Sequence, residues 1–274
     1  MLRALLFRQQ PKLITTRTAT ATVAATLFFT PHTHHNNNKN NNQVRFRTGK
    51  RKKMTDWQNL SDDLLEVYRQ RGPKPSGYDF YRSIGSPKHL VAPMVDQSEL
   101  AFRQLCKKYG AHLAYTPMFH SKIFLEDVHY RYDHFQTSHD EMPLLIQLCG
   151  NDPQIVLDCA KCCLKIAAIQ GNAHVIAGVD LNLGCPQRIA KRGFYGSYLM
   201  DDLELVRNIV STLHQNLPVP VTVKIRIFPR LEDTLAYVDM LVEAGAQMIV
   251  VHGRLRDQRG HNQGLADWEV IRQV

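Results

Sequence analysis

Amides, a thiol and several cations stand at the ends of short apolar segments in this sequence. The densest group is Asn182-Leu183-Gly184-Cys185-Pro186, in which the thiol lies between a glycine and a proline, so we expect it to be exposed. Lys224–Arg226 and His252–Arg254 place cationic or titratable side chains at the ends of two further apolar runs, and Gln147 ends another. Polar groups that converge on the ends of several strands are typical of an active site.

Each of these residues also has a structural explanation. Gln147 could cap a strand end, Cys185 could be a small buried hydrophobe, and His252 could be a satisfied core histidine. Lys224 is harder to explain in this way, because a lysine within an apolar strand needs a partner or a bound anion. The arginines at the same strand ends are equally hard to explain. Taken together, the residues favour a functional interpretation.

Short apolar runs alternate with amphipathic segments from His89 onward. We expect strands over 90–94, 113–115, 144–148, 179–183, 221–227 and 248–251. We expect helices over 98–109, 153–169, 203–217 and 232–244, and a further helix at the end of the chain. The strands lack clean period-two alternation, as parallel strands buried on both faces do. The alternation of strands and helices predicts βα units in a parallel sheet.

The predicted fold class is α/β with six βα units. A doubly wound sheet can close with six strands, whereas a TIM (β/α)8 barrel needs two more units, and periodicity does not choose between them. In a barrel the strand-end groups all lie on the C-terminal rim, where active sites are built. We divide the chain into a basic tail over 1–55, a lead-in over 56–88 and a catalytic domain over 89–274.

The charge of the chain is concentrated in its first residues. The formal net charge is +9, but residues 1–53 hold 11 lysines and arginines and no acid, so the remaining chain is close to neutral. The Ala-, Thr- and Arg-rich start is typical of a mitochondrial transit peptide, with an unconstrained extension as the alternative. An asparagine tract follows, and Lys50–Lys53 is typical of a nuclear-import or RNA-phosphate patch. Translation could also start at Met54.

The six cysteines are scattered through a mid-sized chain, so we expect reduced thiols. Cys159, Cys162 and Cys163 resemble a metal or redox motif, but they lie in a predicted helix and lack a second ligand pair. We expect them to pack on a helix face and expect no metal site. No apolar run approaches the length of a membrane span, so we expect no membrane partner.

At this point the sequence resembles the tRNA-dihydrouridine synthases, flavin enzymes that reduce uridine in tRNA. The resemblance runs from about Leu90 to Val274, and its most specific parts are 182–196, 221–226 and 251–254. The extension Gln187–Lys191, followed by Tyr195-Gly196, is most similar to the eukaryotic branch named for uridines 16 and 17 of the D loop.

The resemblance implies a barrel that binds FMN, uses NAD(P)H as reductant and acts on tRNA. Hydride from flavin N5 would add to C6 of uracil, and Cys185 would give a proton to C5. The resemblance assigns FMN binding to Pro93, Met94, Val95, Gln147, Lys224 and His252. It assigns substrate binding to Asn182, Arg226, Arg254, Arg188 and Lys191, with Arg192, Arg256 and Arg259 as further candidates for tRNA phosphates or for ordering the substrate loop.

Members of this family continue with two further strands, which supply a glycine-rich phosphate site, and with a helical tRNA-binding domain. We therefore expect this chain to be a fragment, or a truncated form, that binds FMN weakly or not at all. A flavin reductase of free pyrimidines and a non-catalytic RNA-binding fragment are the alternative functions. We expect a monomer in the cytoplasm or nucleus, and the tail leaves a mitochondrial location open.

Overall fold

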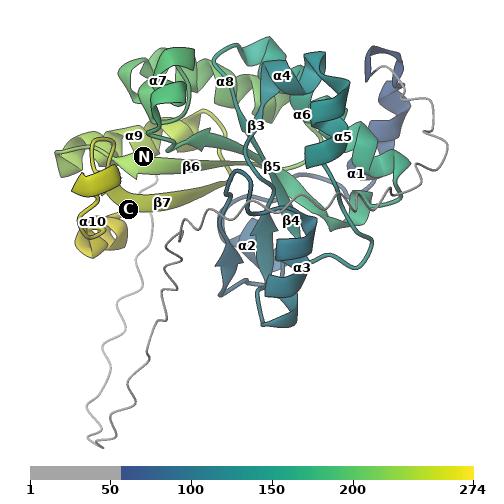
Figure 1. Cartoon of the computed structure of the whole chain (residues 1–274), viewed down its shortest axis with the longest axis horizontal. Helices are drawn as coiled ribbons and strands as arrows, with labels where there is room; N and C mark the ends of the chain where they lie inside the picture. Colours follow the sequence, from purple (N-terminus) through teal and green to yellow (C-terminus); the bar gives the residue numbers. More distant parts are fainter. Residues whose placement is uncertain (1–56) are drawn as a thin grey trace, which may run out of the picture. The chain divides into compact units, whose positions relative to one another are not determined.

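The computed structural model describes residues 57–274, and the element at their centre is a parallel β-sheet (Figure 1). Its strands are β1 Leu90–Val91, β2 Leu113–Tyr115, β3 Phe119–His120, β4 Leu144–Cys149, β5 Ile176–Leu183, β6 Val221–Ile227 and β7 Met248–Leu255. The strand order is β1-β2-β4-β5-β6-β7, with β3 beside the end of β4, and every pair is parallel. The expectations for the tail over 1–55 lie outside the described residues.

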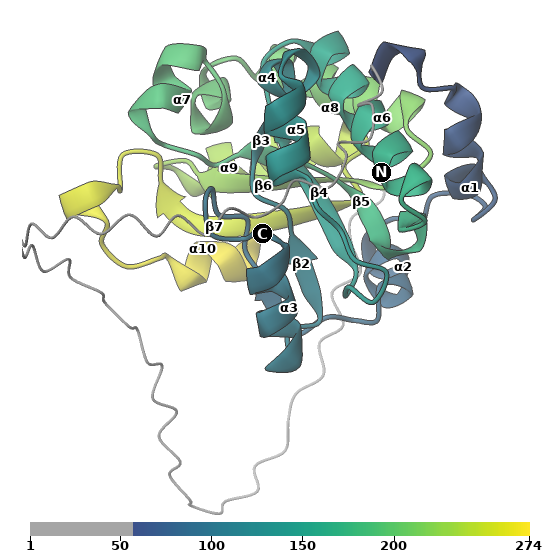
Figure 2. The same ribbon diagram turned by 45° about the vertical axis from the view of Figure 1, so that its right-hand side comes forward.

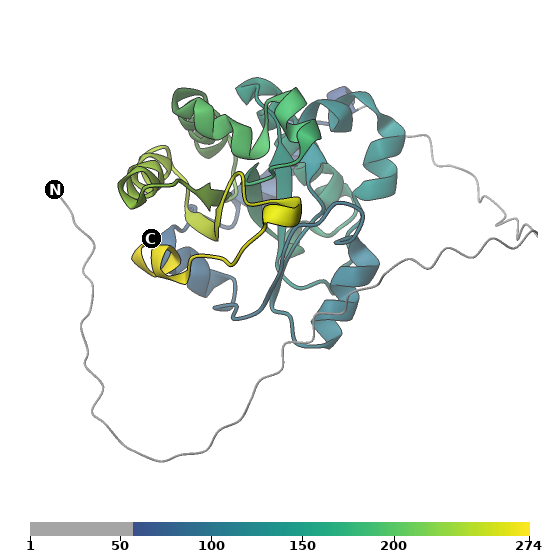
Figure 3. The same cartoon turned by 60° about the vertical axis from the view of Figure 1, so that its left-hand side comes forward.

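Ten α-helices connect or flank the strands of residues 57–274. They are α1 Glu66–Arg69, α2 Gly77–Ser83, α3 Leu100–Lys108, α4 Ser121–Glu126, α5 Val128–His134, α6 Pro153–Ile169, α7 Arg188–Gly193, α8 Leu203–Asn216, α9 Leu231–Glu243 and α10 Trp268–Gln273. Short 3₁₀ turns include η4 Gly196–Asp201. Figure 3 shows the helices on the outer side of a curled sheet, which is the arrangement of an incomplete TIM barrel.

Helix ends follow from capping residues in the sequence. The Asp152 carboxylate accepts hydrogen bonds from the backbone amides of Gln154 and Ile155, both at 2.9 Å, and so starts α6. Asp202 starts α8 in the same way by accepting from Leu205 at 3.0 Å. Gly171 follows α6 with φ +75°, a conformation in which glycine is favoured. These signals explain why the observed bounds of the long helices lie within two residues of the expected ones.

The two faces of the sheet carry different residues. Alternate residues of β4, β5 and β6 pack with α6 and α8 in the main core, and they are Leu144, Ile146, Leu148, Val179, Leu181, Leu183, Val221, Val223 and Ile225. Cys159, Cys162 and Cys163 of α6 are buried in the same core as free thiols, which confirms the expected packing role. The intervening residues of the strands therefore point to the inner face of the half-barrel.

Three sequence expectations are corrected by the structure. Strand β7 extends to Leu255, so His252 and Arg254 lie within it rather than after it; a register irregularity at Arg226/Ile227 accompanies this extension. Strand β1, expected over 90–94, ends at Val91, so Pro93 and Met94 lie in the loop after it. The two-residue strand β3 and the short helices α4, α5 and α7 had no expected counterpart, because they are too short to show a period. Among residues 57–274, no helix has the length and apolarity needed to cross a membrane.

Candidate active site

The polar residues of the inner face extend from the middle of the sheet to the C-terminal ends of β5, β6 and β7. Gln147, Asp180 and Thr222 are direct neighbours across three strands and form one row. Further toward the rim, Asn182 pairs with Lys224 and Arg226 pairs with His252. All of these residues share the face opposite the main core, as the alternation of each strand requires. The sheet thus brings together the groups that the sequence placed on four separate strand ends.

A hydrogen-bonded chain joins the three strands inside the sheet. The hydroxyl of Thr222 donates to Oδ1 of Asp180 at 2.6 Å, and Nε2 of Gln147 donates to Oδ2 at 2.8 Å. Nδ2 of Asn182 in turn donates to Oε1 of Gln147 at 2.8 Å. Asp180 is fully buried, and burial raises its pKa to about 6 in spite of these hydrogen bonds and the nearby charge of Lys224.

The turn that carries Cys185 is fixed from below by Asn182. Oδ1 of Asn182 accepts hydrogen bonds from the backbone amides of Gly184 at 3.1 Å and Cys185 at 2.9 Å. Arg226 holds the same turn from the neighbouring strand, because its Nε donates to the carbonyl of Gly184 at 2.8 Å. The thiol is partly exposed, as its place between Gly184 and Pro186 predicts.

A second set of contacts fixes the turn from the side of η4. The amide and hydroxyl of Ser197 donate to the carbonyl of Cys185 at 3.1 and 3.0 Å. The Tyr198 hydroxyl donates to the carbonyl of Pro186 at 3.1 Å, and Arg259 donates to that carbonyl and to the Tyr198 hydroxyl. Arg259 is therefore held against this turn rather than solvated at the rim.

Four cationic or titratable side chains line the neighbouring part of the rim. Arg226 is buried, and its guanidinium also donates to the carbonyls of Leu255 at 2.8 Å and Gln258 at 3.2 Å. Within residues 57–274, the Lys224 side chain makes no hydrogen bond or ion pair, and Nε of Arg254 is buried without an acceptor. We call Lys224, Arg226, His252 and Arg254 the cationic cluster.

Burial and charge set the protonation of the cationic cluster. Burial lowers the pKa of Lys224, partly offset by Asp180. Burial, and then the charges of Arg226, Lys224 and Arg254, lower the pKa of His252 to about 4. The imidazole is therefore neutral near pH 7, and the cluster presents fixed positive charge beside a neutral histidine. Such a site attracts an anionic or electron-rich group.

The loop after β1, which holds Pro93, Met94 and Val95, is positioned by a buried ion pair. The Met94 amide donates to the Ser98 hydroxyl at 2.9 Å, and that hydroxyl donates to the Met94 carbonyl at 3.0 Å. Arg103 donates to the Ser98 carbonyl at 2.7 Å and pairs with Glu141, and both charged side chains are buried. Among the described contacts, none joins this loop to the Cys185 turn.

Arg188 and Lys191 lie outside the inner face, on α7. Both are exposed and, within residues 57–274, their side chains make no hydrogen bond or ion pair; Ile189 and Phe194 are exposed beside them. In Figures 1 and 2, β6 and β7 run side by side and their arrowheads point toward the side on which α7 lies. Arg256, by contrast, pairs with Asp201 at 2.7 Å.

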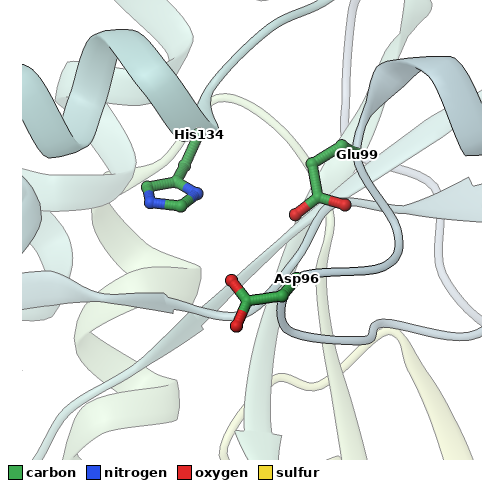
Figure 4. A group of neighbouring side chains, drawn as sticks. All are labelled: Asp96, Glu99 and His134. Atoms are coloured by element: carbon green, nitrogen blue, oxygen red, sulfur yellow. The ribbon is translucent and has the colours of Figure 1, made fainter. Parts of the chain in front are cut away.

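A separate group consists of Asp96, Glu99 and His134, whose ligand atoms lie within 4.8 Å of one another. Figure 4 shows the three side chains pointing toward a common point, from the loop after β1 and from the end of α5. Exposed acidic groups commonly gather without an ion, and nothing else within residues 57–274 marks this group as a metal site.

Sequence reasoning missed Asp180 and Thr222, and it quoted Gly196 only as part of the motif, without its contact to Cys185. A Cβ on Gly196, which has φ +64°, would lie 2.7 Å from the carbonyl oxygen of Cys185 and 2.9 Å from its Cβ. Asp180 did carry a signal in the sequence. It lies two residues before Asn182 in the same strand, so both side chains must be on one face, and an acid within an apolar strand needs a partner. The contact between Gly196 and Cys185 had no such signal.

A curled parallel sheet with polar side chains at the C-terminal rim of its inner face is the architecture of the α/β-barrel enzymes. The sequence pattern of the dihydrouridine synthase family matches residues 90–274. The chain therefore belongs to the dihydrouridine synthase family.

Individual relatives give the same result. The chain is 52% identical over 203 residues to a Schizosaccharomyces pombe protein named tRNA-dihydrouridine(16/17) synthase [NAD(P)(+)], a match that covers 73% of this chain and 49% of that protein. It is 43% identical over 205 residues to a mouse protein of the same name with the suffix "-like", covering 74% of this chain and 41% of the relative. A human tRNA-dihydrouridine(20a/20b) synthase-like protein is 35% identical over 203 residues, covering 73% of this chain and 61% of the relative. The chain thus spans about half the length of the (16/17) relatives.

Proposed function

We propose that this chain carries the active site of a tRNA-dihydrouridine synthase that reduces uridines 16 and 17 of the tRNA D loop. The observation that carries the proposal is the joining of the Cys185 turn, through Arg226, to the cationic cluster on one rim. The higher identity to the (16/17) relatives than to the (20a/20b) relative supports the choice of positions.

The residues of the rim fit FMN, the flavin that the family implies. Lys224 lacks a partner within residues 57–274 and would face an electron-rich edge of the ring, while His252 would contact it as a neutral imidazole. Gln147 retains one amide hydrogen after its hydrogen bond to Asp180. The loop after β1, with Pro93, Met94 and Val95, would supply further contacts. When bound, FMN supplies the hydride for the uracil ring, and NAD(P)H, named for the relatives, is the reductant.

Cys185 is the proton donor in this proposal. The C5=C6 bond of uracil is polarised by the C4 carbonyl, so reduction at C6 leaves negative charge that a proton at C5 must neutralise. The Cys185 thiol is partly exposed at the rim, and its turn is held by Asn182 on one side and by Ser197 on the other. A fixed thiol next to the reacting base can deliver this proton.

Substrate contacts divide between the base and the RNA backbone. Asn182 keeps one amide hydrogen free and would orient the uracil, and Arg254 has a buried Nε available for an acceptor. Arg188 and Lys191 are exposed on α7 and would contact phosphates of the flanking nucleotides. A D-loop uridine must leave its stack to reach such a site, which costs least in a single-stranded loop.

The test is to measure dihydrouridine at positions 16 and 17 of tRNA from cells that carry the wild-type gene, a deletion, or the Cys185→Ala change at the native locus. We expect dihydrouridine at both positions to disappear in the deletion and to fall strongly in the Cys185→Ala strain. Dihydrouridine at 20a and 20b is the internal control and should not change. An unchanged level at 16 and 17 in the deletion would reject the proposed function, and a loss only at 20a and 20b would reject the assignment of positions.

A further inference from the structure

Asp180 is a buried charged group at the centre of the site, and the proposed chemistry leaves it without a role. We propose that Asp180 is a positioning residue: its carboxylate fixes the orientation of the Gln147 amide, and through it the Asn182 amide and the Cys185 turn. The catalytic meaning of this role rests on the proposed function, whereas the geometric role does not.

The first step is the contact between Asp180 and Gln147. An ionised carboxylate only accepts hydrogen bonds, so the Gln147 side chain must turn its NH2 group, and not its oxygen, toward Asp180. Thr222 occupies the other carboxylate oxygen at 2.6 Å and prevents the acid from turning away. All three side chains are completely buried, so no water replaces a lost partner at low cost.

The second step is the contact between Gln147 and Asn182. With its Nε2 directed at Asp180, Gln147 directs Oε1 at Asn182, the next inner-face residue along β5, and accepts from its Nδ2 at 2.8 Å. Turning the Gln147 amide by half a rotation would place its oxygen against the carboxylate and its NH2 against the NH2 of Asn182. Two hydrogen bonds would thus be replaced by two repulsive contacts, which selects a single arrangement.

The third step reaches the reactive residue. Because Nδ2 of Asn182 faces Gln147, its Oδ1 faces the turn and accepts from the amides of Gly184 and Cys185 at 3.1 and 2.9 Å. One N–H of Asn182 then remains to face the rim, while the side-chain oxygen is directed at the turn. It can donate to a carbonyl oxygen, as uracil offers, and it opposes the amino group that cytosine has at the same position.

The Cys185 thiol itself reports the role of Asp180. Alkylation by iodoacetamide, followed by mass spectrometry of each cysteine peptide, gives a separate rate for every thiol of the full-length chain without flavin or RNA. Cys185 packs against the buried cluster of Cys149, Ala190, Tyr195 and Tyr198, so loosening of its turn exposes it to the reagent. Cys106 is also partly exposed but lies on α3, away from this network, and serves as the reference in the same sample. The other four thiols are buried.

The variants Asp180→Leu and Asp180→Asn separate volume from hydrogen bonding. Asp180→Leu removes the acceptor, and we expect the Cys185 rate, relative to that of Cys106, to rise about threefold to tenfold, the range for loss of one net hydrogen bond. Asp180→Asn keeps one acceptor oxygen for Gln147, so its rate should lie closer to that of the wild type. Val210→Ala, a change in the buried face of α8, controls for a general loss of stability and should leave the ratio unchanged.

Two outcomes would overturn the proposal. The first is a folded Asp180→Leu variant in which the ratio of the Cys185 to the Cys106 alkylation rate equals that of the wild type. The second is an equal rise of this ratio in Asp180→Leu and Asp180→Asn, because the lost charge and not the lost acceptor would then set the rate. If Asp180→Leu shows no cooperative melting, Gln147→Met removes the same link, and a wild-type ratio in that variant overturns the proposal as well. Because the assay contains no nucleotide, its result stands apart from the dihydrouridine measurement that tests the proposed function.

Discussion

Gly196 lies so close to Cys185 that any larger residue would collide with the reactive turn. A Cβ at position 196 would stand 2.7 Å from the Cys185 carbonyl oxygen, which also accepts two hydrogen bonds from Ser197. The backbone of Gly196 has φ +64°, so a side chain would also be strained there. Position 196 therefore needs a glycine for two independent reasons: its backbone conformation disfavours other residues, and a side chain there would collide with Cys185.

Replacing Gly196 by alanine should cost more stability than conformational strain alone explains. Gly171 provides the matched control, because it has φ +75° and nothing lies within 4 Å of its added Cβ. We expect Gly171→Ala to cost about 1–2 kcal/mol and Gly196→Ala to cost about 1–3 kcal/mol more, from overpacking against the turn. Urea unfolding of the two variants and the wild type measures both costs. Equal losses in the two variants would show that the turn yields freely to the added methyl group.

The buried pair of Arg103 and Glu141 should be worth far more than an exposed pair. Arg103→Met leaves the Glu141 carboxylate buried without its partner, and we expect a loss of about 3–5 kcal/mol in the free energy of unfolding. Arg230→Met breaks the exposed pair with Asp233 and should leave the unfolding midpoint within error of the wild type.

The double variant Arg103→Met/Glu141→Leu extends this test of the buried pair. Removing both charges leaves no unpaired group, so we expect most of the stability lost in Arg103→Met to return. The Ser98 carbonyl still loses its donor, so the loop after β1 should remain looser than in the wild type. Limited proteolysis of that loop checks this expectation. If the double variant is as unstable as the single one, packing and not charge dominates this site.

Lys224 should contribute to flavin affinity without contributing to the stability of the free protein. Within residues 57–274 its ammonium makes no hydrogen bond or ion pair, so Lys224→Met should not lower the unfolding midpoint without FMN. If FMN binds as proposed, the loss of a charged hydrogen bond should weaken it about tenfold to a hundredfold. Titration of flavin fluorescence measures the affinity, and Lys122→Met on the exposed face of α4 should bind like the wild type. Equal affinities for Lys224→Met and the wild type would remove Lys224 from the cofactor site.

Strong local signals account for what the sequence predicted. The apolar runs located six strands, and the cap at Asp152 with Pro153 gave the bounds of α6 as observed, Pro153–Ile169. The order of βα units then required the strand-end residues to meet on one rim, and Gln147, Asn182 and Cys185 are indeed joined there by hydrogen bonds. Sequence periodicity is sufficient to locate these strands and helices because each of them is long enough to show its own pattern.

The relationships that the sequence could not supply depend on register between strands. Asp180 meets Gln147 and Thr222 only because β4, β5 and β6 are aligned so that these three residues form one row. A shift by one residue in any pair would send one of them to the main core. The approach of Gly196 to Cys185 likewise depends on how η4 folds back over the turn, and no local propensity encodes that distance.

His252 should make the protein less stable in acid, through its neighbours in the cationic cluster. Burial and the charges of Arg226, Lys224 and Arg254 hold its pKa at about 4 in the folded state, against 6.5 for the ordinary side chain. The unfolded chain therefore binds a proton more readily. The stability due to the neutral imidazole is present above pH 6.5 and is lost as the pH falls toward 4, by about 1–2 kcal/mol once solvent screening of this partly exposed side chain is included. Urea unfolding across this range should show His252→Asn gaining on the wild type as the pH falls. Arg254→Gln removes one of the charges, so the loss of stability in acid should be smaller than in the wild type and should be complete at a higher pH. Parallel pH profiles for all three proteins would mean that the cluster does not hold His252 neutral.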